Sequence, residues 1–438
     1  MKKIFTIVMV AVFAMSSFAA DREHTLKVYN WADYIDEDVL NAFPAWYKEM
    51  TGEDVDVIYQ TFDINESMLT EIEVGHEDYD VICPSEYIIE RMLKANLLKK
   101  INKELIPDSL RQFDNVAPFV VDKFQKMSKT ENVSDYTVGY MWGTTGFIYN
   151  PKFVNREDLR SWGAILDPKF EGRIYMKDAF RDVYSVIVLY AYREEIARGE
   201  VSRDELVENI TPERIARVEE ILTAAKDNIA GWEVDFGKEE MTKGKTWMNL
   251  SWSGDAMWAI NEAEEMGIKL EYIVPEEGSN VWFDGWCIPK YAKNEKAASW
   301  FINYMCIPEN AIKNMDFIGY VSVIATPEVR AWVDDCAQWP EPLDLSYFFG
   351  ETAIGVYANP VLYPDKAIID RCALMHDAGE MNEELVKMWN RVKGDNLSPV
   401  MLGIIVVVLL AIIIFAVIQV LNNRKQQQLQ RKRKSHRR

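Results

Sequence analysis

Three short segments far apart in the chain each place a tryptophan within three residues of an aspartate: Trp31-Ala32-Asp33-Tyr34, Trp252-Ser253-Gly254-Asp255 and Trp282-Phe283-Asp284. An aromatic face attracts an ammonium group and covers methylene groups, while a carboxylate accepts a charge-assisted hydrogen bond from the ammonium. In a chain with 14 Trp and 69 acidic residues, any one pair could equally be a packed Trp beside a solvated Asp. The three pairs together favour a site for an organic cation.

Motifs for catalysis or metal binding are absent from the sequence. The chain has no G-x-S-x-G nucleophile motif, no glycine-rich phosphate loop and no H-E-x-x-H zinc motif. Its 4 His and 5 Cys residues are isolated from one another and do not have zinc-like spacing. Two of the many acidic residues could still meet in space and hydrolyse a glycoside. We nevertheless expect a protein that is not an enzyme and that has no cofactor and no metal.

Both ends of the sequence indicate export and membrane anchoring. Residues 1–19 combine two lysines, an apolar run and small residues up to Ala19, as a secretory signal peptide does. Residues 400–421 carry no charge and are long and apolar enough for one transmembrane helix. The tail at 422–438 has basic residues and no acidic one, so we expect it to be cytoplasmic. The alternative, that this tail binds nucleic acid, lacks support from a folded basic domain.

The segment between the two ends is strongly anionic and poor in cysteine. It holds all 69 acidic residues and 39 of the 49 basic ones, a charge of 39 − 69 = −30. Such a field draws cations to a surface, although ordinary solubility would explain it equally well. Five cysteines leave at least one thiol unpaired within the chain, and Cys83 and Cys287 stand in apolar runs typical of buried strands.

The hydrophobic pattern of this segment alternates between short strands and helices. Such alternation is typical of an α/β fold with a mostly parallel sheet, whose ligands bind beyond the carboxyl ends of the strands. About 375 residues exceed one ordinary domain, so two lobes are expected. The predicted strands are 26–29, 55–59, 80–83, 247–250 and 270–274, the predicted helical regions are 39–50, 87–98, 204–230 and 297–305, and 333–364 reads as irregular.

Several ordered motifs resemble one known family, the periplasmic spermidine/putrescine-binding proteins of polyamine ABC transporters. They are Tyr29-Asn30-Trp31-Ala32-Asp33-Tyr34, Pro84-Ser85-Glu86-Tyr87, Tyr140-Met141-Trp142-Gly143, Trp252-Ser253-Gly254-Asp255, Trp282-Phe283-Asp284 and Ile318-Gly319-Tyr320. The resemblance implies a two-lobed periplasmic binding protein of type II that closes about a hinge. We expect residues 25–139 with 283–327 to form lobe 1, and 140–282 with 328–392 to form lobe 2.

The resemblance also implies which residues contact the ligand. Aromatic side chains would enclose its methylene groups, and acids would hold its ammonium groups. The implied ligand-binding residues are Trp31, Asp33, Tyr34, Ser85, Tyr87, Asp178, Asp182, Trp252, Asp255, Trp282, Asp284 and Tyr320. Asp255 is similar to an acid of putrescine-selective members, and Met375 stands where a glutamine reaches the far end of spermidine. Putrescine is therefore the expected preference.

We expect, from these features together, a polyamine receptor whose periplasmic ectodomain is anchored in the inner membrane and delivers its ligand to ABC permease subunits. Two alternatives stay open. A binding protein for another small solute would keep the fold without matched acids at both ends of the site. A sensory ectodomain would need a membrane partner for its output, because the tail after Leu421 is too short to form a domain.

Overall fold

The computed structural model describes residues 22–234, 236–335, 339, 341–394 and 407. The chain divides into two compact units, residues 1–385 and 386–438, and the central β-sheet belongs to the first. Within the described residues, no helix combines the length and the apolar character needed to cross a membrane. The predicted signal peptide at 1–19, the predicted tail at 422–438 and, except for Val407, the predicted span at 400–421 lie outside the described residues.

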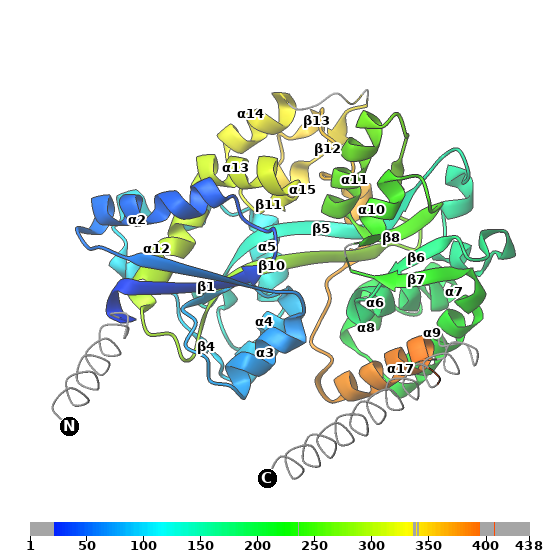
Figure 1. The fold of residues 1–438 in the computed structure, drawn as a ribbon, viewed down its shortest axis with the longest axis horizontal. Coiled ribbons are helices and arrows are strands. Elements are labelled where there is room, and N and C mark those ends of the chain that lie inside the picture. Colours follow the sequence, from blue (N-terminus) through cyan, green and yellow to red (C-terminus); the bar gives the residue numbers. More distant parts are fainter. Residues whose placement is uncertain (1–21, 235, 336–338, 340, 395–406, 408–438) are drawn as a thin grey trace, which may run out of the picture. The chain divides into compact units, whose positions relative to one another are not determined.

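Two long strands form the centre of the first unit and run through both of its lobes (Figure 1). They are β5 (Thr137–Tyr149) and β10 (Ser279–Pro289), which pair antiparallel. Every residue of both strands is buried, which is the pattern of strands covered on both faces. The main path of the 12-stranded sheet is β2-β1-β3-β10-β5-β8-β6-β7. The two lobes are therefore built on opposite halves of the same two strands.

The first lobe is built around parallel strands β1, β2 and β3. Helix α2 connects β1 to β2; it begins after Asp36, whose carboxylate accepts a 2.7 Å hydrogen bond from the Asp38 N–H, and it ends at Gly52, which has a φ of 78°. The elements of this lobe are β1 (Thr25–Trp31), α2 (Glu37–Thr51), β2 (Asp56–Phe62), α3 (Asn65–Glu73), β3 (Val81–Ile82), α4 (Glu86–Lys94), β4 (Leu98–Lys99), α5 (Pro118–Gln125), α12 (Glu295–Met305), α13 (Pro308–Ile318) and β11 (Val321–Ser322).

The second lobe is built on strands β6, β7 and β8, with β6 parallel to both of the others. Its helix α9 begins at Pro212, directly after Thr211, whose hydroxyl accepts a hydrogen bond from the Arg214 N–H. The elements are β6 (Ile174–Lys177), α6 (Phe180–Ala191), α7 (Arg193–Ala197), α8 (Arg203–Glu208), α9 (Pro212–Ala224), β7 (Ile229–Glu233), α10 (Phe236–Thr242), β8 (Met248–Trp252), α11 (Ser253–Glu265) and β9 (Glu271–Ile273).

The segment after β11 divides its contacts between the lobes. Helix α14 packs on α13, and α15 packs on α5, so both lie with the first lobe, whereas the predicted lobe 2 includes residues 328–392. Strand β14 pairs with the start of β10 and contacts α8, in the second lobe. The elements are α14 (Pro327–Asp335), β12 (Leu343–Asp344), α15 (Ser346–Phe349), β13 (Ile354–Val356), α16 (Lys366–Ile369), β14 (Cys372–Ala373) and α17 (Asn382–Gly394), which continues into the second unit.

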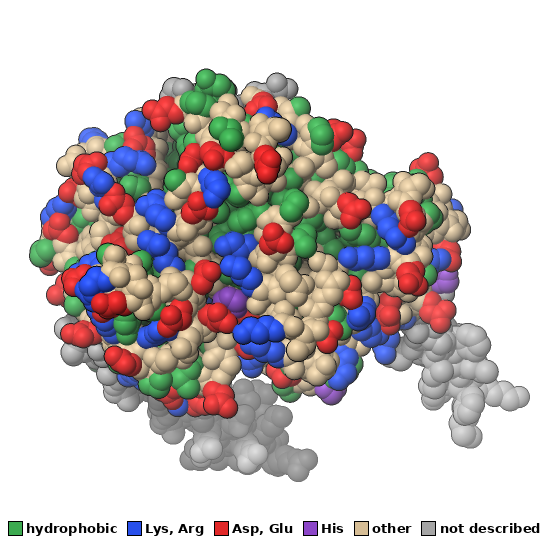
Figure 2. Space-filling view, turned by 180° about the vertical axis from the view of Figure 1, so that it is seen from behind, with side chains coloured by type: hydrophobic (Ala, Val, Ile, Leu, Met, Phe, Trp, Pro, Cys, Tyr) green, Lys and Arg blue, Asp and Glu red, His purple; other side chains and the backbone are tan. Residues whose placement is uncertain are grey.

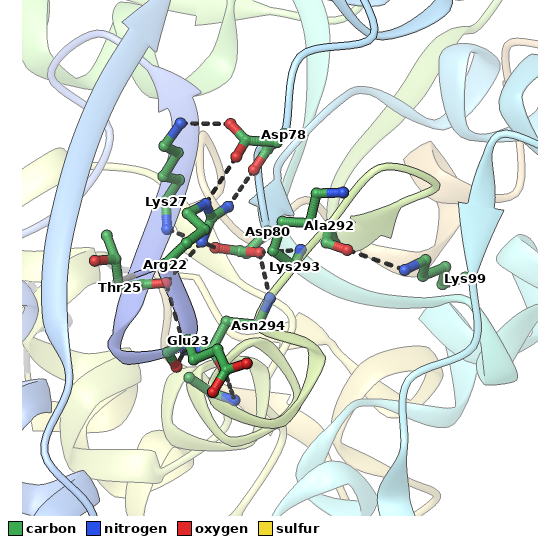
Figure 3. Close-up of polar contacts among 11 residues, drawn as sticks. Arg22, Glu23, Thr25, Lys27, Asp78, Asp80, Lys99, Ala292, Lys293 and Asn294 are labelled. Carbon is green, nitrogen blue, oxygen red and sulfur yellow. Dashed lines mark hydrogen bonds and ion pairs between the residues drawn. The ribbon is translucent and has the colours of Figure 1, made fainter. Parts of the chain in front are cut away.

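The start of the described chain is anchored by the fully buried carboxylate of Asp80 (Figure 3). Its Oδ2 accepts hydrogen bonds from Arg22 Nη1 at 2.7 Å and from the backbone N–H of Lys27 at 2.9 Å. Its Oδ1 accepts hydrogen bonds of 2.8 Å from the backbone N–H groups of Lys293 and Asn294. One side chain therefore ties the residues before and within β1 to the start of α12.

The structure shows how the charged side chains are distributed on one face and where four of the cysteines lie. On the face shown in Figure 2, Lys and Arg side chains lie among those of Asp and Glu, so the negative charge there is interspersed rather than gathered in one patch. Cys83, Cys287, Cys306 and Cys372 are buried free thiols, and the prediction that Cys83 and Cys287 are buried is confirmed. Cys336 lies outside the described residues.

Candidate functional site

The predicted site residues Asp284, Tyr34 and Ser85 converge where the first lobe meets the central strands. Asp284 lies on β10, Tyr34 lies in the loop after β1, and Ser85 directly precedes α4. Ser85 and Asp284 form an isolated antiparallel bridge. The expected position beyond the carboxyl ends of the parallel strands is therefore where these three side chains meet.

The carboxylate of Asp284 is buried, with 6% of the residue exposed, and the side chains of the described residues that donate hydrogen bonds to it are two hydroxyl groups. Tyr34 Oη donates to its Oδ2 at 2.8 Å, and Ser85 Oγ donates to its Oδ1 at 2.7 Å. Asn65 Nδ2 in turn donates to Ser85 Oγ at 3.0 Å. Burial raises the pKa of Asp284 to about 6, and the negative charge of Asp182 adds to the rise. A cation placed here would favour the ionised form.

Aromatic rings stand beside this carboxylate. The ring centroid of Tyr320 lies 5.4 Å from that of Tyr34 and 5.6 Å from that of Trp282. Two glycines permit this packing: a Cβ on Gly143 would collide with the Trp282 indole, and a Cβ on Gly254 would collide with the Tyr320 ring. Such a group of π faces suits both methylene and ammonium groups.

A second buried carboxylate, Asp182, lies on α6 in the second lobe. Its Oδ1 accepts a 3.0 Å hydrogen bond from Trp252 Nε1 and a 3.3 Å hydrogen bond from Asn280 Nδ2. Burial raises the pKa of this carboxyl, and the two donors partly offset the rise. Asn280 Nδ2 also lies 3.5 Å from the sulfur of Met375, which is 2% exposed.

Asp255 differs from these two carboxylates because it already has basic partners. Its Oδ2 lies 2.9 Å from Lys177 Nζ, and its Oδ1 lies 3.4 Å from Lys238 Nζ. The Tyr320 hydroxyl also donates to Oδ1 at 2.9 Å. Burial opposes ionisation, but the two lysines lower the pKa of Asp255 below its ordinary value. The sequence indicates an acid available to the ligand, whereas in the structure this acid is neutralised by the chain itself.

The remaining predicted residues lie in more varied surroundings. Trp31 is half-buried and packs on Phe62, with ring centroids 4.5 Å apart. Asp33 is exposed and has a φ of 53°. The Tyr87 hydroxyl accepts a 3.0 Å hydrogen bond from Asn65 Nδ2. The backbone N–H of the half-buried Asp178 donates to the Glu233 carbonyl at 2.6 Å.

Sequence reasoning missed several polar residues at this site. Asn65 and Asn280 hold Ser85 and Asp182, respectively, and no motif pointed to either amide. Glu86 is fully buried: its Oε2 accepts a 3.0 Å hydrogen bond from the Phe283 N–H, while its Oε1 has no hydrogen-bond partner in the described part of the chain. Burial raises the pKa of Glu86 well above its ordinary value. Glu86 stands inside one of the sequence motifs, so its proximity to Ser85 was the signal that could have identified it.

The arrangement can bind an organic cation. Asp182 and Asp284 come from different lobes, and neither has a Lys or Arg at ion-pair distance among the described residues. Burying a carboxylate without a countercharge is costly, so a cationic ligand would relieve that cost. Within the same residues, no three of His, Cys, Asp and Glu are grouped so that they could hold a metal ion.

Comparison with known proteins places the chain in a family. Residues 44–341 match the family described as bacterial extracellular solute-binding protein. The chain is 28% identical over 318 residues to the spermidine/putrescine-binding periplasmic protein of Escherichia coli, covering 72% of this chain and 81% of that protein. It is 26% identical over 334 residues to the putrescine-binding periplasmic protein PotF of Escherichia coli, covering 73% and 84%.

A solved structure agrees with this result. The spermidine/putrescine ABC transporter substrate-binding protein PotD of Streptococcus pneumoniae superposes with a TM-score of 0.62 at 26% identity, covering 84% of this chain and 98% of that one. The two-lobed α/β binding-protein fold expected from the sequence is therefore confirmed. Because the family match extends over more than half of the sequence, the chain belongs to the bacterial extracellular solute-binding proteins.

Proposed function

We propose that the protein is an extracytoplasmic receptor that binds putrescine or spermidine, delivers it to an ABC permease and performs no chemistry of its own. The observation that carries this proposal is the buried carboxylate of Asp284, which two hydroxyl groups hold without a countercharge beside the rings of Tyr34, Tyr320 and Trp282. An ammonium group would supply the missing charge, and the rings would cover the adjoining methylene groups.

The names of the relatives support the class of ligand. Those in Escherichia coli are described as binding spermidine and putrescine, or putrescine, and the related structure from Streptococcus pneumoniae is described as part of a spermidine/putrescine ABC transporter. Acids in both lobes fit a linear ligand with an ammonium group at each end. Except for Asp255, which already pairs with Lys177 and Lys238, the residues implied by the resemblance remain our proposed ligand contacts, with Asp182 and Asp284 as the ammonium acceptors.

The proposal includes the route and the anchoring of the receptor. Residues 1–19 would direct export, residues 400–421 would hold the ectodomain at the inner membrane, and the basic tail at 422–438 would remain in the cytoplasm. Lobe 1 would comprise 25–139 with 283–327, and lobe 2 would comprise 140–282 with 328–392, although α14 and α15 pack with the first lobe. The two lobes would close on the ligand about β5 and β10.

Calorimetry and thermal melting of the full-length protein in mild detergent test the function. Putrescine or spermidine should bind with 1:1 stoichiometry, because the two carboxylates of Asp182 and Asp284 accommodate the two ends of one linear cation. Binding should also raise the melting temperature, since a ligand of the native state stabilises it. The absence of heat and of a melting shift with either amine at about millimolar concentration, where even weak ligands register, would refute the proposal.

A further inference from the structure

Lys177, the last residue of β6, has a fully buried side chain. Its Nζ lies 2.9 Å from Asp255 Oδ2 and 3.2 Å from Glu233 Oε1, and it also donates to the carbonyl of Val234. The same Nζ stands 4.3 Å from the ring centroid of Trp252. Burial opposes the charge of Lys177, but the two carboxylates raise its pKa above its ordinary value, so its amine remains an ammonium.

This environment is one that would suit the ammonium group of a bound amine. It offers an indole face, two carboxylates and a backbone carbonyl, and it excludes water. Trp252 contacts both Lys177 and the neighbouring acid Asp182. Its ring faces Lys177 Nζ, and its Nε1 donates a 3.0 Å hydrogen bond to Asp182. Tyr320 links Asp255 to the aromatic rings beside Asp284, since its ring lies against Trp282 and its hydroxyl donates to Asp255.

We infer that Lys177 is a specificity-determining residue whose own ammonium group fills the cation position at Asp255 and Trp252, so that the site favours a diamine over a triamine. The inference rests on the proposed polyamine function and deepens it. The acids left for the ligand are Asp182 and Asp284, which suit the two ends of a short diamine. A third ligand nitrogen reaching past Trp252 meets a like charge and finds its carboxylate already paired.

A preference for putrescine then follows from the charge of Lys177 and not from a ligand contact made by Asp255. Asp255 acts by holding Lys177 in place rather than by contacting the ligand. Lys177 and Lys238 offer a matched comparison, because both pair with Asp255 but the Lys238 side chain is 26% exposed and pairs with the other carboxylate oxygen. Loss of Lys177 should open a buried cation position, whereas loss of Lys238 should not.

The test compares the dissociation constants of putrescine and spermidine for the full-length wild-type protein, Lys177→Met and Lys238→Met. The wild-type protein should bind putrescine more tightly. In Lys177→Met the ratio should shift toward spermidine by roughly tenfold or more, because a repelling charge becomes a vacant site beside two acids. Lys238→Met should keep the wild-type ratio. An unchanged ratio in folded Lys177→Met, or an equal shift in Lys238→Met, would overturn the inference.

A second measurement needs no substitution and applies if Lys177→Met fails to fold. The wild-type protein is titrated with the spermidine analogue whose terminal amine on the aminopropyl arm is replaced by a hydroxyl group. This analogue should bind more tightly than spermidine, since it lacks the repelled charge; weaker binding would overturn the inference. A wild-type protein that binds neither amine would refute the proposed function as well, whereas binding of both with the predicted preferences reversed would refute only the inference.

Discussion

The hydroxyl of Tyr34 donates a 2.8 Å hydrogen bond to Oδ2 of Asp284, a residue 250 positions later in the chain. The bond joins the loop after β1 to the central strand β10. It orients the carboxylate and favours its charge, but a hydroxyl group carries no positive charge to balance it. Among the described residues, Asp284 thus has an oriented carboxylate with no Lys or Arg at ion-pair distance.

Replacing Asp284 by Asn should abolish tight polyamine binding and at the same time stabilise the free protein at neutral pH. Removing one partner of a buried charge pair costs on the order of 2 to 5 kcal/mol of binding. The rise of the Asp284 pKa from 3.8 to about 6 corresponds to a stability penalty on the order of 3 kcal/mol, which the amide would not incur. Calorimetry and denaturant unfolding measure the two effects.

The pH dependence of this stability gain provides its control. Because the pKa of Asp284 in the folded state lies above its unfolded value, the penalty is absent near pH 4 and grows until the pH passes about 6. Asp284→Asn should therefore gain stability over the wild-type protein at pH 7.5 and gain almost none at pH 4. An equal gain at both pH values would contradict a cause in the carboxyl charge.

Polyamine affinity of the wild-type protein should fall as the solution becomes more acidic. The ligand binds the ionised carboxylate, and burial holds the pKa of Asp284 at about 6 in the free protein. The dissociation constant should be nearly constant above pH 7 and should rise below pH 6, by up to about tenfold per pH unit for one proton. Titration calorimetry at a series of pH values measures this slope, and a flat profile from pH 7.5 to 5 would contradict the assignment.

Gly254→Ala should weaken ligand binding by displacing an aromatic ring. The added Cβ would collide with the Tyr320 ring, which packs against Trp282. Gly267→Ala is a suitable control, because Gly267 follows the same helix with a φ of 72° and has open space around it. Both variants should lose stability, but only Gly254→Ala should raise the dissociation constant, by about tenfold or more. Equal affinities would show that Tyr320 does not contact the ligand.

Asp80→Asn should destabilise the fold without changing ligand affinity. Four donors converge on the Asp80 carboxylate, and an amide would turn its own N–H groups toward some of them. The expected loss is about 3 kcal/mol of unfolding free energy. Asp78→Asn is the control, since Asp78 is 29% exposed and its ion pairs contribute about 1 kcal/mol or less. Denaturant unfolding separates the two variants, and similar losses would contradict the role of Asp80.

Deleting residues 400–438 should release the receptor from the membrane, because residues 400–421 are the proposed anchor. Deleting only 422–438 leaves the span intact and should keep the protein in the membrane fraction. Fractionation followed by immunoblotting distinguishes these results. Recovery of the full-length protein in the soluble periplasmic fraction would contradict the proposed anchor.

Local signals predicted the elements that local interactions define. Helix α2 (Glu37–Thr51) follows the predicted region 39–50 because it has an apolar face and is flanked by the capping residue Asp36 and by Gly52. The predicted helix 87–98 is wrong at its end: α4 stops at Lys94, Asn96 has a φ of 54°, and Leu98 pairs with Pro289 of β10. A strand pairing across 191 positions (289 − 98 = 191) leaves no trace in the local pattern.

The contrast between local signals and long-range contacts also explains the outcome for the region 204–230 and for the site. The predicted helical region contains α8, α9, a short 3-10 helix (Lys226–Asn228) and the start of β7, because α8 ends at Glu208, α9 begins only at Pro212, and Ile229 pairs with Ile174 of β6. The aromatic and acidic residues of the site could be selected by type and spacing. The sequence could not show which of these acids pair with the chain's own lysines. Lys177 and Asp255 are 78 positions apart, and only the folded sheet brings them together.

The pairing of β5 with β10 also bears on when the molecule can fold. Val281 pairs with Thr144, and the 281 − 144 = 137 positions between them contain most of the second lobe. Contacts of such sequence separation form late, because the intervening chain must first be brought into a closed loop. During synthesis from the N-terminus, β8 and β9 become available to pair with β5 before β10 does. We therefore expect the pairing of β5 with β10, on which both lobes are built, to form after the pairing of β5 with β8 and β9.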